Sequence, residues 1–290
     1  MKRFIALLAV LLLTGCALQQ PRETHPQETL EPLYVHFVDV GQADCILLQC
    51  GDTDILIDGG NHDTGAEAVG YLAQHGVDDL ELVVNTHPHG DHIGGLPTVL
   101  SVFDAEKIWC STAEFDTNTY SQFCDQADRQ GVEVEVPAVN ETYTAGDLTL
   151  TVIGPLGSGY EDLNDTSLVI MAQYGEKKFL FAGDMEALAE RELVEAGTDL
   201  KADLLKVGHH GSYSSTCYRF LREVDPDYAV IMCGRDNAYG HPHEGPLSRL
   251  LQSGAGVWRV DKQGDIVAVC DGQTIAFFWE RGDAVPTKLD

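Results

Sequence analysis

Short apolar runs alternate with amphipathic stretches along most of the chain. Apolar runs that end at Gly, Asp or Asn predict strands, and apolar residues spaced three or four apart predict helices. Strands are predicted at residues 34–40, 45–48, 54–60, 82–86, 107–110, 132–136, 148–153, 167–174, 178–181, 204–207, 228–233, 256–260, 266–270 and 274–278. Helices are predicted at residues 66–75, 97–103, 120–130, 184–196, 217–223 and 246–252.

The order of these elements indicates the fold class. They fall into two blocks, each with strands and then helices. Such blocks indicate an α/β fold in which two sheets pack face to face with helices outside. At 290 residues, of which 44% are hydrophobic, the chain can bury the core of one large domain. We expect this domain to span residues 32–290.

The first residues lie outside this pattern. A basic start precedes an apolar stretch at residues 4–13 that is too short to span a membrane, so residues 1–16 are predicted to be an export signal. The Leu-Thr-Gly before Cys16 resembles the bacterial lipobox, and the alternative is an ordinary signal peptide with an unrelated cysteine. A lipidated Cys16 would tether the protein to the outer face of a bacterial membrane. The polar residues 17–31 are predicted to form a flexible tether.

The formal net charge of −28 narrows the range of partners. So acidic a protein repels nucleic acid and anionic lipid, which argues against tight, extended binding of DNA. It does not argue against cleavage of a phosphodiester at a metal site, because bound cations supply local positive charge. Several of the seven cysteines other than Cys16 lie inside apolar strand patterns, where buried thiols are common, so no disulfide framework is predicted.

The densest polar cluster follows the predicted strand at 82–86. His87, His89, Asp91 and His92 lie within six residues. Imidazole and carboxylate ligands suit zinc, iron or manganese. A turn at the end of a strand can direct alternate side chains to one point and the next two to a second point. We therefore predict one metal held by His87 and His89, and a second held by Asp91 and His92.

Two later strands also end in metal-ligating residues. Asp184 ends an apolar run and precedes a predicted helix, where it either bridges two metals or caps the helix. His209 and His210 follow the predicted strand at 204–207. One of them is expected to complete the second metal site, and the other to orient a ligand or to protonate a leaving group. The sequence leaves open which is which.

Further candidates are supporting or substrate-binding residues. Asp58 ends the third strand and is expected to accept the N–H of a metal-bound histidine, although an aspartate in a glycine-rich turn is the plainer interpretation. Asp44 is a weaker candidate of the same kind, because its segment could be only a hairpin turn. His241 could assist a leaving group, or it and His243 could simply be turn residues at a helix start.

The H-x-H-x-D-H run resembles the signature of metallo-β-lactamase fold hydrolases. The motifs at residues 41–44, 57–60, 87–92, 164–169, 182–184, 207–212, 239–243 and 260–266 resemble, in the same order, the hydrolase domain at the extracellular end of ComEC competence proteins. The resemblance covers residues 33–280. It implies an αββα four-layer sandwich with a two-metal site at one edge, holding two zinc ions, although manganese occurs among similar proteins.

The chain departs from the superfamily pattern at one ligand. Typical members use a further histidine between the first motif and the bridging aspartate, but no histidine lies between His92 and Asp184. Asn164 and Ser167 lie in the segment at that place, so the resemblance implies an unusual third ligand for the first metal. This departure argues against a true β-lactamase. Beyond the signal segment no run approaches the roughly 20 apolar residues of a spanning helix, so we expect a stand-alone lipoprotein without the ComEC channel.

These observations predict an exported, membrane-anchored metal-dependent hydrolase, a phosphodiesterase or nuclease that uses a metal-bridging hydroxide. Asp91, His209 and His241 are the expected catalytic residues. The alternatives are a hydrolase of a small phosphoester, lactone or thioester at the cell surface, and a non-catalytic metal-binding lipoprotein. A DNA enzyme should carry Lys and Arg around its pocket, and few lie near these motifs apart from Lys206 and two arginines, Arg219 and Arg235.

Overall fold

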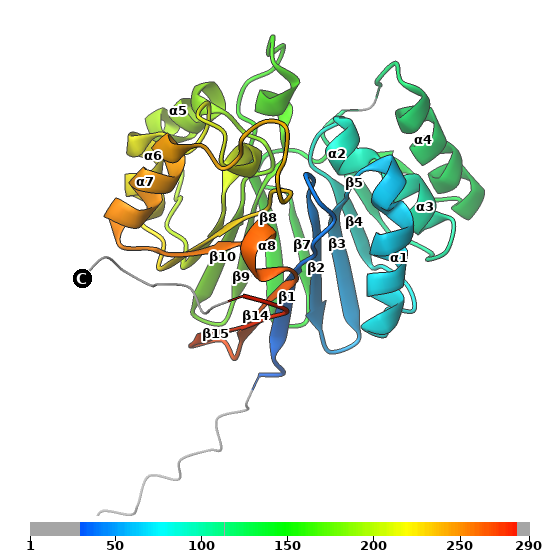
Figure 1. Ribbon diagram of the computed structural model, residues 1–290. Coiled ribbons are helices and arrows are strands. Elements are labelled where there is room, and N and C mark those ends of the chain that lie inside the picture. Colours follow the sequence, from blue (N-terminus) through cyan, green and yellow to red (C-terminus); the bar gives the residue numbers. More distant parts are fainter. Residues whose placement is uncertain (1–29, 113, 283–290) are drawn as a thin grey trace, which may run out of the picture.

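The structure, a computed structural model, describes residues 30–112 and 114–282 (Figure 1). The predicted signal peptide, Cys16 and nearly all of the predicted tether lie outside the described residues. Within the described ranges, no helix is long and apolar enough to cross a membrane.

Two sheets form the centre of the fold (Figure 1). The first has eight strands in the order β15 (Ile275–Trp279), β14 (Ile266–Cys270), β1 (Leu33–Phe37), β2 (Cys45–Cys50), β3 (Thr53–Gly59), β4 (Leu82–Asn85), β5 (Ile108–Cys110) and β6 (Val134–Glu135). The second has seven strands in the order β13 (Gly256–Arg259), β12 (Tyr228–Ile231), β11 (Leu204–Lys206), β10 (Lys177–Phe181), β9 (Val169–Tyr174), β8 (Leu148–Gly154) and β7 (Thr142–Ala145).

Helices cover the outer face of each sheet (Figure 1). On the first sheet lie α1 (Gly65–Gln74), α3 (Leu96–Leu100) and α4 (Asn118–Gln130), and on the second lie α5 (Ala187–Ala196), α6 (Tyr218–Val224) and α7 (Glu244–Ser253). Two short helices, α2 (Gly90–Ile93) and α8 (Val260–Gln263), lie in connections. Helix α4 shows how sequence sets the bounds: the Thr117 hydroxyl accepts the Tyr120 N–H at its start, and left-handed Gly131 ends it.

The apolar residues divide into three layers, as the strand pattern requires. One buried cluster joins the facing sides of the two sheets, with Val35 and Phe37 of β1 packed in the same layer as Phe179 of β10. A second lies between the first sheet and its helices, and a third lies between the second sheet and its helices. This confirms the predicted αββα sandwich.

The predicted elements lie close to the observed ones, with three exceptions. Helix α2, helix α8 and strand β7 were not predicted, because β7 has no buried residue and the two helices are mostly polar single turns, so none of them contains an apolar run. The helix predicted from Asp184 begins at Ala187 instead, so Asp184 lies in the loop between β10 and α5.

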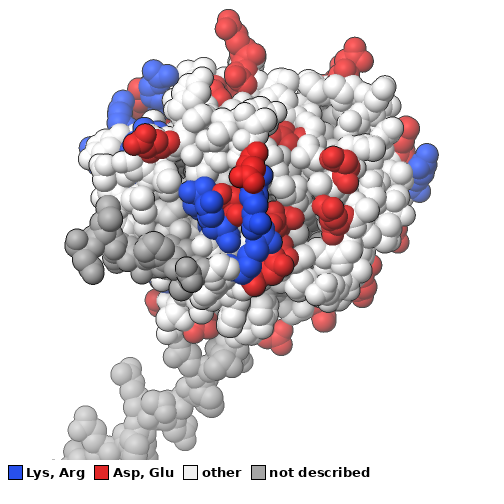
Figure 2. Space-filling view, in the orientation of Figure 1, with Lys and Arg blue, Asp and Glu red and all other residues white. Residues whose placement is uncertain are grey.

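The surface carries mostly acidic charge, and its basic residues are largely paired. In Figure 2, Lys and Arg side chains near the centre of the face lie against red acidic ones. The ion pairs of this region join Arg259 and Lys262 to Asp261, and Arg281 to Asp39 and Glu280. These pairs leave little positive potential for a polyanion on this face.

Candidate metal centre

The predicted metal-ligating residues all follow strand ends at one edge of the sandwich. Strands β3 and β4 are parallel neighbours in the first sheet, and β10 and β11 are parallel neighbours in the second. Asp58 lies at the end of β3, the histidine motif follows β4, Asp184 follows β10, and the pair His209 and His210 follows β11. Because the carboxyl ends of parallel strands meet at the same edge, residues far apart in the sequence converge there.

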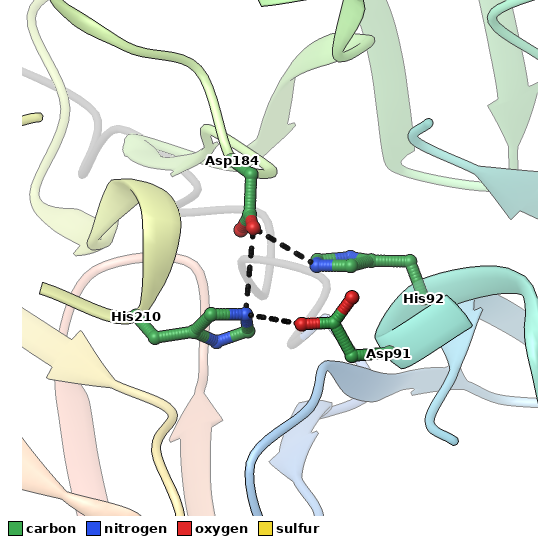
Figure 3. A group of neighbouring side chains, drawn as sticks. All are labelled: Asp91, His92, Asp184 and His210. Atoms are coloured by element: carbon green, nitrogen blue, oxygen red, sulfur yellow. Dashed lines mark hydrogen bonds and ion pairs between the residues drawn. The ribbon is translucent and has the colours of Figure 1, made fainter. Parts of the chain in front are cut away.

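Four side chains form the larger of two compact groups of possible ligands among the described residues (Figure 3), which we call the second subsite: Asp91, His92, Asp184 and His210. Their ligand atoms all lie within 4.8 Å of one another. Asp184 Oδ2 lies 3.3 Å from His92 Nε2 and 3.4 Å from His210 Nε2, and Asp91 Oδ2 lies 3.3 Å from His210 Nε2. Two imidazoles and two carboxylates suit zinc or manganese.

Buried atoms without partners indicate that a cation fits this group. Asp184 Oδ1 is buried and has no hydrogen-bond partner among the described residues, and buried His92 Nε2 has only its ion-pair contact with Asp184 Oδ2. Buried polar atoms are normally satisfied, since leaving one unsatisfied costs about 1–3 kcal/mol. A divalent cation bound between these side chains would satisfy both. The role of the four residues as ligands stays a prediction, but the structure places them as that prediction requires.

His87 and His89 lie beside this group and form what we call the first subsite. His87 Nε2 lies 3.0 Å from His89 Nδ1 and 3.9 Å from Asp184 Oδ2. Ligands about 2.0–2.1 Å from a tetrahedral zinc ion lie roughly 3.4 Å apart, so the two imidazoles can share one cation. Within the described part of the chain, the pair does not belong to a group of three ligands as compact as the second subsite.

Asp58 and Asp44 contact the imidazoles of the second subsite at their Nδ1 atoms, on the side away from Asp184. Asp58 Oδ2 lies 2.8 Å from His92 Nδ1, and Asp58 Oδ1 accepts the backbone N–H of Thr86 at 2.8 Å. Asp44 Oδ1 lies 3.3 Å from the Nδ1 atom of His210, which also lies 2.9 Å from the Met232 carbonyl oxygen. Both aspartates are buried, so they orient imidazoles and do not reach substrate.

Lys206 is part of this support and cannot contact DNA. It is fully buried, it forms an ion pair with Asp44, and its ammonium donates to the Gly183 carbonyl oxygen at 3.2 Å. Arg219 and Arg235 are exposed, and Arg219 pairs with Glu195 at 3.6 Å. Neither arginine lines the cavity described below.

Backbone geometry directs His209 and His210 toward the same aspartate. Both adopt left-handed conformations, with φ of 46° and 52°. His210 thereby reaches the second subsite, while His209 Nε2 lies 3.8 Å from Asp184 Oδ2. A side chain at Gly208 or Gly211 would clash, since an added Cβ would lie 2.9 Å from Met185 O and 2.7 Å from Pro242 Cβ, respectively.

Sequence reasoning missed Glu186. Its Oε1 lies 2.8 Å from His209 Nδ1 and accepts the hydroxyl of Ser214 at 2.7 Å. Only its position two residues after Asp184 hinted at a role. Ser167 is buried beside Asp184, and its hydroxyl accepts the backbone N–H of Asp184 at 3.0 Å. Ser167 therefore positions the aspartate and does not bind substrate.

Histidines of the two subsites differ in proton affinity. Burial lowers the pKa of His92 and of His210, but nearby carboxylates, above all Asp184, outweigh burial and raise both values well above the ordinary one. Burial and the neighbouring His92 hold the pKa of His87 well below its ordinary value. Burial, assisted by His210 and His209, lowers the pKa of His241 to about 4.

A cavity of about 340 Å³ opens onto both subsites. It is lined by Gln42, His89, Gly90, Asp91, Asn164, Asp184, His209, His210, Tyr239 and His241. No Lys or Arg is among these lining residues, all of which belong to the described chain. His241 lies at the rim, where Gln42 Nε2 is 3.2 Å from its Nδ1, whereas His243 is turned away and accepts the Tyr213 N–H at 3.0 Å.

Comparisons with known proteins agree with this geometry. Residues 38–235 match the family model described as the metallo-beta-lactamase superfamily. The chain is 30% identical over 196 residues to ComE operon protein 3 of Bacillus subtilis, covering 68% of this chain and 25% of that protein. It is 32% identical over 225 residues to Recombination protein 2 of Haemophilus influenzae, covering 74% of this chain and 26% of that protein. It thus spans about a quarter of the length of these relatives.

A solved structure resembles the fold. The metallo-beta-lactamase fold protein YhfI from Bacillus subtilis aligns with a TM-score of 0.59 at 15% identity, covering 83% of this chain and all of that one. At this identity the likeness concerns the fold alone.

Proposed function

The chain belongs to the metallo-beta-lactamase superfamily, as a ComEC-type domain, and from this premise we propose that this metal-dependent hydrolase is a phosphodiesterase that holds two divalent cations. One observation supports the proposal most directly. A single carboxylate oxygen, Asp184 Oδ2, lies between 3.3 and 3.9 Å from the Nε2 atoms of four histidines: His87, His92, His209 and His210. A carboxylate surrounded by four imidazoles would suit a ligand shared between two cations.

A pair of divalent cations supplies Lewis acidity and an activated water in such a site. The chain's own residues then have distinct tasks. Asp91 and His89 hold ligand atoms at the cavity wall, while Asp58 and Asp44 keep the buried imidazoles in place. His241 faces the same cavity, and because its pKa is lowered to about 4 it is a weak base and has no imidazolium proton to donate at pH 7.

The charge of the cavity favours a short substrate over duplex DNA. A protein that follows a DNA backbone neutralises several phosphates with Lys or Arg. The described lining carries no such residue, and Arg259 and Arg281 are engaged in ion pairs with Asp261 and Asp39. We therefore propose a small phosphodiester, or one exposed end of a polymer, as the substrate.

Location at the outer face of a bacterial membrane remains part of the proposal. It is supported by the basic and apolar start of the sequence and by the lipobox-like segment at Cys16. Labelling of growing cells with a radioactive fatty acid tests it: wild type should incorporate label, and Cys16→Ala should not.

A second candidate is hydrolysis of a lactone or thioester. The absence of Lys and Arg from the described lining favours it, because a neutral carbonyl substrate needs no cationic side chain for recognition. The two candidates share the metal centre and differ only in the group that is cleaved.

The deciding experiment measures metal content and hydrolysis together. Wild type loaded with Zn²⁺ or Mn²⁺ should hold about two cations and cleave bis-p-nitrophenyl phosphate. Asp184→Ala should lose about 10³-fold or more in rate, since it removes the shared ligand and with it several kcal/mol of transition-state stabilisation. Bound metal with cleavage of a lactone or thioester, but of no phosphodiester, would favour the second candidate. Bound metal with no hydrolysis of either would indicate a metal-binding protein.

A further inference from the structure

We propose that Asn164 Oδ1 and His209 Nε2 complete the first subsite, in place of the histidine that the chain lacks between His92 and Asp184. The inference rests on the proposed two-cation site and deepens it. It concerns which residues of this chain hold the cation beside His87 and His89.

Asn164 presents a buried oxygen to the cavity. The residue is 6% exposed and lines the cavity, and its Oδ1 atom is buried with no hydrogen-bond partner among the residues described. Its Nδ2 donates to Glu186 Oε1 at 3.3 Å. Turning the amide over would place Oδ1 against that carboxylate, so the hydrogen bonding fixes the oxygen on the other side. A carboxamide oxygen in this position is a suitable ligand for a divalent cation.

His209 lies beside Asn164, whose Nδ2 is 3.4 Å from its Nδ1, and has a ring nitrogen near Asp184. Because the Glu186 carboxylate can only accept, His209 Nδ1 must carry the proton of their 2.8 Å contact, which leaves a lone pair on Nε2. That Nε2 lies 3.8 Å from Asp184 Oδ2, and His87 Nε2 lies 3.9 Å from the same oxygen. Histidines that ligate metals are commonly held in this way, by a carboxylate on the other ring nitrogen.

Glu186 couples the two ligands. Its Oε1 accepts from both Asn164 Nδ2 and His209 Nδ1, and the hydroxyl of Ser214 also donates to it. One carboxylate therefore sets the orientation of both groups. This explains how a chain without the usual histidine can still surround a cation: the missing ligand is replaced by two side chains from separate loops, aligned by a third.

The rival interpretation is that Asn164 and His209 bind substrate and touch no metal. Metal content separates the two, because a residue that binds only substrate does not change how many cations the protein holds. The second subsite supplies an internal control for folding, since a variant that still binds one cation tightly has kept its structure there.

The experiment loads the full chain with Zn²⁺, removes excess by dialysis and measures zinc per chain, alongside calorimetric titration with Zn²⁺. Wild type should hold about two cations, and Asn164→Ala and His209→Ala should each hold about one. Glu186→Gln should weaken the binding of the second equivalent by about 10- to 100-fold. His243→Ala, which removes an imidazole that does not line the cavity, should hold two.

Two cations in both alanine variants, bound as tightly as in wild type, would overturn the inference, as would a wild type that holds only one. Two cations in wild type without phosphodiester cleavage would instead contradict the proposed function and leave the inference standing. Absorption of Co²⁺-loaded protein gives an independent check: Asn164→Ala and His209→Ala should lose the bands of one cobalt and keep those of the other.

Discussion

Asp184 belongs to the second subsite and lies 3.9 Å from His87 of the first, but the two subsites differ in how far the protein preassembles them. In the second subsite, four ligands lie within 4.8 Å of one another, and buried carboxylates hold His92 and His210 from behind. In the first subsite, His87 receives only a hydroxyl contact, from Thr86 at 3.2 Å, and His89 lies at the cavity wall. Preassembly lowers the ordering entropy lost on binding, so we expect the second subsite to fill first.

The difference follows from where each subsite obtains its residues. In the second, His92 of α2 and His210 are buried, and the buried carboxylates of Asp58 and Asp44 hold them. As proposed, the first also draws on Asn164, in the 3-10 helix Leu163–Thr166, and on Glu186, immediately before α5, and His89 and Asn164 line the cavity. The molecule thus combines a well-supported group of candidate ligands with a less supported one, and the cavity reaches both.

The largest expected effect comes from the buried ion pair beneath the second subsite. Lys206→Met leaves Asp44 buried and uncompensated, which should lower the free energy of unfolding by about 3–5 kcal/mol. It should also weaken the second subsite, because Asp44 contacts His210. Urea unfolding of the metal-depleted protein measures the first effect. The double variant Lys206→Met, Asp44→Asn should recover much of the loss, and a single variant as stable as wild type would show that the pair contributes nothing.

A smaller effect is expected at Asp58. Asp58→Asn removes the charge that holds His92 Nδ1 and should weaken the second subsite by about 10- to 100-fold while leaving the first nearly unchanged. Competition with a chromophoric chelator measures both affinities. Equal weakening of the two would mean that the subsites are not supported independently, and Asp63→Asn, an exposed carboxylate, serves as the control.

The smallest expected difference between the two subsites is how their metal affinity depends on pH. With the pKa of His92 and of His210 raised, both hold protons at neutral pH that a cation must displace, whereas His87, with its pKa lowered, is already neutral. Affinity of the second subsite should therefore rise as pH rises, by about tenfold per unit for each proton displaced. The first should change little above pH 7. Calorimetry in buffers of different ionisation enthalpy counts the protons, and release only with the later equivalent would reverse the assignment.

Much of this arrangement could be predicted from the sequence, because strand ends are easy to recognise. Apolar runs locate β3, β4, β10 and β11, and the parallel pairing of neighbours brings Asp58, Asp184 and the histidines to one edge. The resemblance to ComEC hydrolase domains placed Asn164 where typical superfamily members carry a metal-binding histidine. The apolar runs are local signals, and the motifs follow one another in the same order as in the related domains, so both can be recognised from the sequence.

The rest depends on three-dimensional details that sequence spacing does not carry. The roles of adjacent His209 and His210 follow from two left-handed backbone conformations, which no periodicity reveals. Glu186 acts through a hydrogen bond to a residue more than twenty positions away. Lys206 looked like a surface cation because lysines are almost never fully buried, and only its ion pair with Asp44 explains its place inside.

The centre also joins the two halves of the sandwich, since Asp91 and His92 belong to the half built on the first sheet, and Asp184 and His210 to the other. A cation bound between them is a tie that the unfolded chain lacks, and it adds about 2.7 kcal/mol of stability when its concentration is 100 times its dissociation constant. The folded fraction, and with it resistance to surrounding proteases, then rises and falls with the local supply of the metal. The time that the protein survives would then depend on the concentration of metal around it as well as on its sequence.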